Sequence, residues 1–144
     1  MGYSMGSAER WRQFRKRSAD MHQALNGLSS LFEREGVVLA YLFGSLSKGQ
    51  EGEDVDLAIL VRDVPAFLLR EPILNCLGTE RVDLVDLRAA SPVLGFEIIR
   101  SGRPIYVADD RVQEQFELST LRLYRDTSPL RRRQVKYLRR RMGL

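Results

Sequence analysis

Apolar side chains recur every three or four residues near the start of the chain. The series runs from Trp11 through Leu25 to Phe32, which places its members on one side of a helix. Gly36 follows shortly after and is typical of a helix end. The pattern therefore predicts a long N-terminal helix with one apolar face. Residues 1–7 precede this helix and are expected to form a flexible N-terminus.

Further along, apolar residues come in unbroken runs or alternate, as they do in strands. Val37–Phe43 is apolar at every position, which is typical of a strand covered on both faces. Val55–Val61 and Val82–Leu87 predict two more strands, and Pro104–Val107 predicts a fourth. Because proline lacks the N–H group that an inner strand donates, the fourth strand is expected at an edge of the sheet.

Helices are predicted between these strands. Pro65–Leu77 has a helical pattern, although Pro72 within it predicts a kink or two short pieces. Ser91 followed by proline is typical of a helix start, so a second helix is predicted over Pro92–Arg100. Gly102 closes it.

Two helices, separated at Ser128-Pro129, are predicted toward the C-terminal end, and Asp109 or Asp110 caps the first of them. The second could turn four apolar side chains toward the body of the protein: Leu130, Val135, Leu138 and Met142. Helices and strands thus alternate along the chain, which predicts an α/β or α+β domain built on one sheet. This single domain is expected to span residues 8–144, with its core at residues 37–108.

Length and composition narrow the class of protein. The chain has 144 residues, which suffices for one domain with a sizeable core. It contains no apolar run of about 18 residues, so no membrane partner is expected. Its single cysteine, Cys76, cannot form an internal disulfide, which indicates a reducing, cytoplasmic compartment. Cys76 itself is expected in the core.

The positive charge is concentrated at the C-terminal end. The net charge of the chain is +4, yet the segment from Thr127 onward holds seven basic residues and no acidic one. The remainder therefore carries 16 basic against 19 acidic residues, a net charge of −3. A basic segment indicates an acidic partner or nucleic acid. It is also typical of a helix face that is merely solvated, and the sequence leaves both interpretations open.

Two aspartates at the start of a predicted strand are the first candidates for chemistry. Asp54 and Asp56 are two residues apart, so their carboxylates project from one face of the strand. Two carboxylates this close repel each other unless a cation lies between them. Mg²⁺ prefers oxygen ligands and is commonly held by one or two carboxylates together with substrate phosphates. The pair therefore predicts a magnesium site, with a solvated strand end as the alternative.

A candidate phosphate site precedes this pair. Gly44 and Ser45 directly follow the buried strand, and eight residues separate Ser45 from Asp54. Glycine lets the backbone approach a ligand closely, and backbone N–H groups at a helix start bind anions. Lys48 can add a positive charge. The arrangement differs from a P-loop, whose GxxxxGK[ST] pattern the chain lacks.

The next strand can supply a third carboxylate. Asp83 and Asp86 both lie in VDLVDL and are three residues apart, so a regular strand turns them to opposite faces. Only one of them can join Asp54 and Asp56. The spacing alone leaves open which one does.

Three segments in this order resemble the nucleotidyltransferase superfamily of DNA polymerase beta: GSLSKG from Gly44, DVDLAILV from Asp54 and VDLVDL from Val82. More narrowly, the chain is similar to the minimal nucleotidyltransferases, called MNT, which are often paired with HEPN-domain toxins. FEIIRSGRPIYVADD, with LYRDTSPLRRR in the helix that follows, resembles the end of bacterial MNT antitoxins, so the similarity covers about residues 37–140. It implies the nucleotidyltransferase fold, in which one mixed sheet is flanked by helices.

The resemblance also implies a role for each candidate residue. Gly44 and Ser45, with Lys48 nearby, would hold the phosphates of ATP. Asp54 and Asp56 would bind Mg²⁺, and Asp83 would complete the catalytic metal site and help to deprotonate the acceptor. An acceptor hydroxyl would then attack the α-phosphorus of ATP, and pyrophosphate would leave. In this reading ATP is the substrate and Mg²⁺ the cofactor.

The implied partner is a HEPN ribonuclease toxin, whose tyrosine would receive AMP and which would thereby be neutralised. The chain departs from the family pattern at Glu53, where relatives often have serine, and at Ser47-Lys48, where Ala-Arg is common. These departures bear on the rate and on the choice of nucleotide.

Two other functions remain open from the sequence. One is transfer of a nucleotide to an antibiotic or metabolite, although such enzymes usually carry an added helical domain. The other is an antitoxin that acts by binding alone. Direct nucleic-acid binding is not expected, because only Tyr124 and Tyr137 accompany the basic segment, too few aromatic residues for a single-strand platform.

Overall fold

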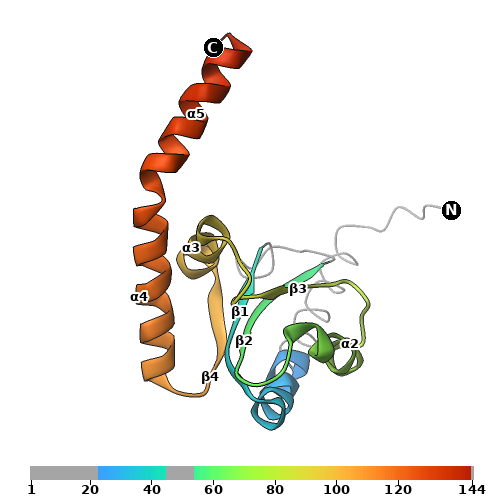
Figure 1. The fold of residues 1–144 in the computed structure, drawn as a ribbon. Coiled ribbons are helices and arrows are strands. Elements are labelled where there is room, and N and C mark those ends of the chain that lie inside the picture. The colour runs from blue at the N-terminus through green and yellow to red at the C-terminus, as the bar shows by residue number, and fades with distance from the viewer. Residues whose placement is uncertain (1–22, 45–53, 144) are drawn as a thin grey trace, which may run out of the picture.

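The computed structural model describes residues 23–44 and 54–143, and a four-stranded mixed sheet lies at its centre (Figure 1). The strands stand in the order β3-β2-β1-β4. β1 pairs antiparallel with both β2 and β4, whereas β2 and β3 run parallel. Their bounds are Val37–Phe43 for β1, Val55–Val61 for β2, Val82–Asp86 for β3 and Arg103–Val107 for β4. All four predicted strands are confirmed, and the proline-containing strand β4 lies at an edge as expected.

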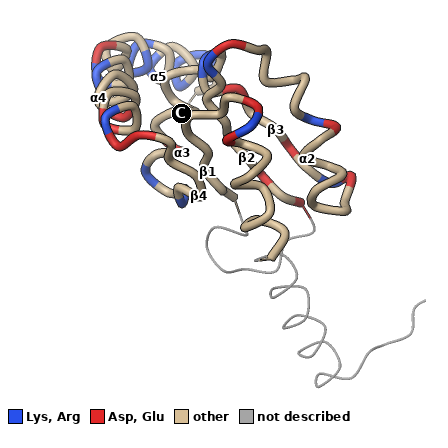
Figure 2. The backbone as a smooth tube through the Cα atoms, turned by 90° about the horizontal axis from the view of Figure 1, so that it is seen from below, with Lys and Arg blue, Asp and Glu red and all other residues tan. Residues whose placement is uncertain are grey.

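Helices cover both faces of this sheet (Figure 2). Residues 23–35 are helical, and the part of the predicted N-terminal helix before them lies outside the described residues, as do residues 1–7. The other helical elements are η2 (Ala66–Leu69), α2 (Arg70–Leu77), α3 (Pro92–Ser101), α4 (Asp110–Asp126) and α5 (Ser128–Met142). The expected class, one mixed sheet flanked by helices, is therefore confirmed.

Two apolar clusters hold the helices to the sheet. On one face, the helix at 23–35 packs through Leu28 and Phe32, and α2 packs through Ile73, all of them almost fully buried. On the other face, Ile98 of α3 joins Tyr41 and its neighbours, with α4 packed against them. Val37–Leu42 is buried throughout because β1 lies between these two layers. This explains why its sequence shows no alternation.

The segment around Pro72 forms two pieces, one of the two outcomes predicted. η2 ends at Leu69 and α2 begins at Arg70, so Pro72 falls in the first turn of α2. Proline is tolerated there because the first N–H groups of a helix have no intrahelical partner. The Arg70 side chain donates from Nη1 to the carbonyl of Val82, 2.8 Å away, and so ties α2 to the start of β3.

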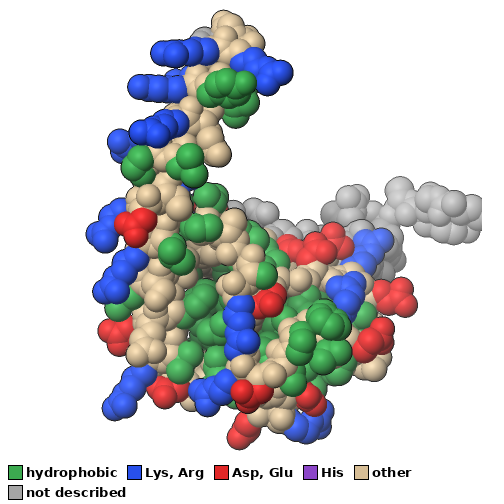
Figure 3. All heavy atoms as spheres, viewed as in Figure 1, with side chains coloured by type: hydrophobic (Ala, Val, Ile, Leu, Met, Phe, Trp, Pro, Cys, Tyr) green, Lys and Arg blue, Asp and Glu red, His purple; other side chains and the backbone are tan. Residues whose placement is uncertain are grey.

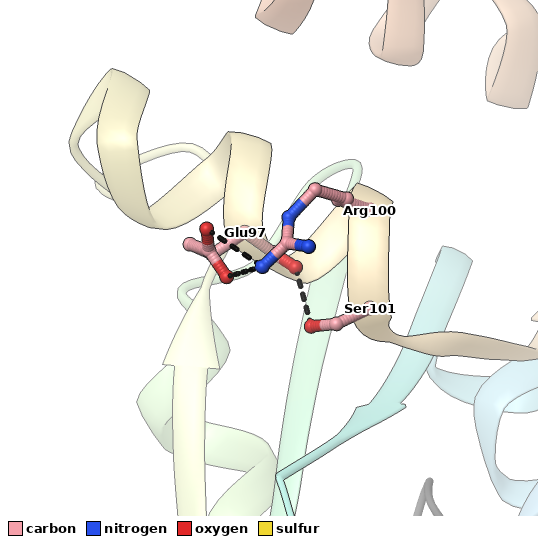
Figure 4. A network of polar contacts seen from close by, with 3 residues as sticks. All are labelled: Glu97, Arg100 and Ser101. Atoms are coloured by element: carbon pink, nitrogen blue, oxygen red, sulfur yellow. Dashed lines mark hydrogen bonds and ion pairs between the residues drawn. The ribbon is translucent and has the colours of Figure 1, made fainter.

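The turn from α3 into the edge strand is tight. Arg100 reaches back to Glu97, with Nη2 2.8 Å from Oε2 and 3.1 Å from Oε1, and the Ser101 hydroxyl donates to the carbonyl of Glu97 (Figure 4). This exposed pair contributes little stability by itself. Gly102 follows, and a Cβ there would lie 2.4 Å from the carbonyl oxygen of Ile98, so the close approach to the last turn of α3 requires glycine.

Two expectations from the sequence are wrong. Cys76 is exposed on α2 rather than buried, because α2 turns Ile73 to the core and Cys76 to another side. The apolar residues of α5 are not packed against the body as expected: no residue of α5 is buried, and Leu138 and Met142 are 52% and 68% exposed. Beyond Thr127, α5 extends past the sheet, and within the described residues it contacts the body at its base, through Arg131 and Tyr124 (Figure 1). None of the described helices is long and apolar enough to cross a membrane.

Candidate active site

The candidate site lies where β1 ends and β2 begins. Antiparallel pairing places Phe43, the last residue of β1, opposite Asp56 near the start of β2. Gly44 follows with a φ angle of +74°, a conformation that side chains disfavour. A Cβ at Gly44 would come within 2.1 Å of Oδ2 of Asp56. The backbone therefore lies directly against this carboxylate, and only glycine fits.

The register of the parallel strands brings Asp56 and Asp83 together. They are direct partners across β2 and β3, so their side chains leave the same face of the sheet. Asp86, three residues on, aligns with Ile59 instead. Asp83 is thus the aspartate of VDLVDL that the structure places beside Asp56.

Asp86 belongs to a different surface. Together with Leu84 it lines a pocket of about 260 Å³, and the other lining residues are Pro65, Ala66, Phe67 and Arg70. Its Oδ1 accepts a hydrogen bond from the backbone N–H of Arg88, 3.0 Å away. This side chain therefore serves the turn that follows β3.

The face that bears the carboxylates is the one covered by α3 and α4. Asp56 and Ala58 are two residues apart on β2 and so share a face, and Ala58 belongs to the apolar cluster that includes Ile98 of α3. Asp56 is half-buried and Asp83 is exposed. The carboxylates of Asp56 and Asp83 therefore lie at the solvent-exposed end of this face of the sheet. The rest of the face belongs to the apolar core.

All the effects of the surroundings on Asp56 raise its pKa. Burial raises its pKa most, followed by the charge of Asp83, a hydrogen bond with Asp83 and the charge of Asp54. Asp54 stands just before β2 and is exposed, yet it is close enough to act on Asp56. The fold thus concentrates negative charge here, and a bound cation would relieve it.

The carboxylates of the site are ligands of the type that Mg²⁺ prefers, but they are only partly arranged to bind it. Among the described residues, no group of three Asp, Glu, His or Cys side chains is arranged so that it could hold a metal ion by itself. Asp56 and Asp83 offer adjacent hard oxygen ligands, with Asp54 nearby. Mg²⁺ commonly takes one or two carboxylates and completes its shell with water and substrate phosphates. The site therefore fits an ion that arrives with a phosphate ligand.

Three other candidate residues lie outside the described part of the chain. Ser45 and Lys48, expected at the phosphates, and Glu53, the departure from the family pattern, all fall within residues 45–53. Their assignments stay predictions.

A hydrogen-bonded pair of side chains that the sequence did not suggest lies near the site. Tyr41 in β1 is almost fully buried, and its hydroxyl donates to Oε1 of Glu117 on α4 at 2.7 Å. Gln113 donates to the same oxygen at 3.3 Å. Burial, followed by the hydrogen bond and charge of Glu117, raises the pKa of Tyr41 well above its usual value. The pair fixes α4 against β1, the strand that leads to Gly44. In the sequence, the only sign of this pair was a tyrosine within an apolar run.

The chain is similar in sequence to known nucleotidyltransferases. A family model described as polymerase beta, nucleotidyltransferase matches residues 26–111. The protein adenylyltransferase MntA of Shewanella oneidensis is 34% identical over 92 residues, which are 60% of this chain and 65% of MntA. The aligned stretch thus spans somewhat less than two thirds of that relative.

Solved structures are similar over more of the chain. One is a toxin–antitoxin crystal structure with AMP-PNP, which aligns with a TM-score of 0.69 and 28% identity over 79% of this chain and 97% of the other. Another contains a tri-AMPylated HEPN toxin of Shewanella oneidensis in complex with its MNT antitoxin. It aligns with a TM-score of 0.67 and 27% identity over 82% of this chain and 98% of the other.

Proposed function

Because the chain belongs to the polymerase beta nucleotidyltransferase family, we propose that it is an MNT-type antitoxin that transfers AMP from ATP to a tyrosine of its cognate HEPN ribonuclease toxin. The similarity to a protein adenylyltransferase supports the type of reaction. The similarity to complexes that hold AMP-PNP in one case and an AMPylated HEPN toxin in another supports the nucleotide and the acceptor. A reaction that consumes ATP also suits a cytoplasmic protein.

One arrangement of residues in this chain supports the proposal. Asp56 and Asp83 lie side by side on β2 and β3, and the backbone of Gly44 lies against the Asp56 carboxylate. A phosphate chain held at Gly44 would therefore meet a pair of carboxylates at its side. This is the arrangement that metal-assisted phosphoryl and nucleotidyl transfer uses.

Each residue takes a part that its position allows. Asp54, Asp56 and Asp83 would hold Mg²⁺, which supplies positive charge to neutralise the triphosphate and the developing charge on the leaving group. The backbone of Gly44, which lies next to Asp56, would bind phosphate oxygens, with Ser45 and Lys48 assigned to the same phosphates. Asp83 is exposed, so it can face an acceptor that arrives from solvent.

The proposed reaction moves AMP from ATP to the toxin tyrosine. The phenol oxygen of the toxin tyrosine attacks the α-phosphorus of ATP, and a bond forms between this oxygen and phosphorus. The bond from the α-phosphorus to the oxygen that bridges to the β-phosphorus breaks, and pyrophosphate departs with its electron pair. The phenol proton passes to the carboxylate of Asp83, which acts as general base.

The test uses the intact mass of the cognate HEPN toxin after incubation with this protein, ATP and Mg²⁺. The expected result is one or more additions of the mass of AMP, which disappear with Asp56→Ala and persist with Asp86→Ala. A toxin that binds the wild-type protein and never changes mass would show the proposed chemistry to be wrong.

A second candidate function, neutralisation by binding alone, is favoured by one observation. Among the described residues no three potential ligands form a ready metal site. The two functions differ in what survives separation of the complex. A toxin freed from the antitoxin by denaturation and refolded should remain inactive as a ribonuclease if it has been AMPylated. It should regain activity if contact alone had inhibited it.

A further inference from the structure

The C-terminal helix α5 stands away from the rest of the molecule. It buries none of its residues (Figure 1). It follows α4 at an angle and leaves the body on the side where β1 ends and β2 begins, which is the end of the sheet with the candidate site. We call α5 the arm. A protein has no evident structural need for such a helix, since it adds nothing to the core.

The base of the arm is fixed to the body. The ring of Tyr124 on α4 stacks on Phe96 of α3, with centroids 3.9 Å apart and planes 14° from parallel. Arg131, in the first turn of the arm, lies over the other side of this ring at 3.8 Å from the centroid. Its Nη1 also donates to the carbonyl of Tyr124 at 2.8 Å and to the hydroxyl of Thr127. The direction of the arm is therefore set by contacts with the body.

The arm has an apolar face. Val135, Leu138 and Met142 are three and four residues apart and so lie on one side of the helix. They are 49%, 52% and 68% exposed. Figure 3 shows hydrophobic side chains on the part of the arm that looks toward the body, and most of its basic side chains along the outer edge.

The opposite face is strongly basic. Five cations repeat there at helical spacing: Arg132, Arg133, Lys136, Arg139 and Arg140. Within the described residues, no ion pair involves a cation of the arm, and the arm has no acidic residue. An exposed apolar stripe edged by uncompensated cations is complementary to an apolar groove with acidic rims.

Other occupants fit this surface less well. Two arms paired with each other would bury the apolar stripes, but they would bring two sets of cations together without a single acid between them. Nucleic acid would use the cations and leave the apolar stripe in water. An anionic lipid surface could use both faces. It would, however, lie across the end of the sheet, where the proposed function requires an acceptor.

We propose that the arm is the docking element for the toxin, and that its apolar stripe inserts into an acid-rimmed apolar groove of the toxin so that the acceptor segment reaches the site at Gly44 and Asp56. This inference rests on the proposed function and adds to it the surface that selects the partner. Docking through a separate element would let the site itself stay open and small, since the partner brings its own acceptor.

The test measures toxin binding and AMP transfer with purified cognate HEPN toxin. Val135→Ser/Leu138→Ser removes the centre of the stripe, and Arg132→Glu/Arg139→Glu reverses charge at its edge. The matched control is Leu118→Ser/Leu121→Ser on α4, where the side chains are similarly exposed at 47% and 42%. Because all these positions are exposed, circular dichroism should show unchanged folding of the body.

Both arm variants are expected to raise the Kd for the toxin and the KM for the toxin in AMP transfer by about tenfold or more. The kcat at saturating toxin should stay within about twofold of the wild-type value, because the arm takes no part in the chemistry. The α4 control should match the wild-type protein in all three quantities. The Kd of the wild-type complex should also rise with salt, and more steeply than that of the Arg132→Glu/Arg139→Glu variant.

Four outcomes would overturn the proposal. If the wild-type protein modifies the toxin and the arm variants do so equally well, only the docking role falls. If the wild-type protein neither binds nor modifies the toxin, the proposed function falls with it. A dimer that the stripe variant converts to monomer, at unchanged toxin affinity, would assign the stripe to a second copy of the chain. Binding to phosphatidylserine vesicles that the variant loses, again at unchanged toxin affinity, would assign it to lipid.

Discussion

The backbone of Gly44 lies against the carboxylate of Asp56 so closely that a Cβ at Gly44 would be 2.1 Å from Oδ2 and 3.1 Å from Cγ. This contact joins the two halves of the proposed site, the phosphate segment after β1 and the acidic start of β2. It also makes the site sensitive to a single methyl group.

Gly44→Ala should therefore abolish most AMP transfer, by about 100-fold or more, because the Asp56 carboxylate must move away. Gly36→Ala provides a matched control. Gly36 has a similar φ angle of +78° but nothing within 4 Å of an added Cβ. Both variants should lose about 1 kcal/mol of stability from the left-handed backbone. Equal activity of the two variants, measured by incorporation of labelled AMP, would contradict the role of the contact.

Asp56→Asn should stabilise the metal-free protein at neutral pH. The pKa of Asp56 is raised in the folded protein above its ordinary value of 3.8. Folding therefore favours the protonated form, and the contribution of Asp56 to stability is lost as the pH rises through the raised pKa. We expect the variant to melt about 1–3 °C higher at pH 7.

The difference should shrink as the pH falls below the ordinary pKa of an aspartate, where the wild-type side chain is protonated in both states. Melting curves recorded from pH 3 to pH 8 in a chelator measure this trend, with Asp63→Asn, at an exposed position, as control. Added Mg²⁺ and an ATP analogue should stabilise the wild-type protein more than Asp56→Asn. A wild-type advantage in chelator at pH 7 would count against the raised pKa.

Asp83→Asn and Asp86→Asn should behave differently although the two residues are three apart. Asp83 partners Asp56 across the strands, so its amide variant should lose AMP transfer by about 100-fold or more. Asp86 aligns with Ile59 and accepts from Arg88, so its variant should retain activity within about threefold. A ranking in the opposite order, at equal amounts of folded protein, would assign the third carboxylate to Asp86.

Tyr41→Phe should cost about 1 kcal/mol of stability, because Glu117 loses a partly buried hydrogen-bond donor. Gln113 still donates to the same carboxylate, which limits the loss. Urea denaturation measures the effect. Tyr106→Phe is the control, since Tyr106 is another tyrosine of the sheet, half-buried, whose ring centroid lies 5.6 Å from that of Phe32. A loss at Tyr106 as large as that at Tyr41 would argue against a special role for the Glu117 bond.

The sequence by itself determined the elements and the kind of chemistry. Strands β1 and β2 were recognisable because apolar runs follow directly from burial between two layers, and the bounds Val37–Phe43 and Val55–Val61 match. Gly44 and the Asp54–Asp56 pair stood out because a glycine and two like charges at strand ends conflict with core packing. Conflicts of this kind are local, so a sequence shows them.

Only the tertiary structure decided what depends on contacts between distant segments. The parallel register of β2 and β3 places Asp83, and not Asp86, beside Asp56. The local sequence pattern does not distinguish these two aspartates. The packing of α4 on β1 paired Tyr41 with Glu117 across 76 positions of sequence. The apolar spacing of α5 predicted a face correctly, but not that the face would be exposed. An amphipathic pattern records which side of a helix is apolar, whereas the surface that covers it is set by where the helix lies.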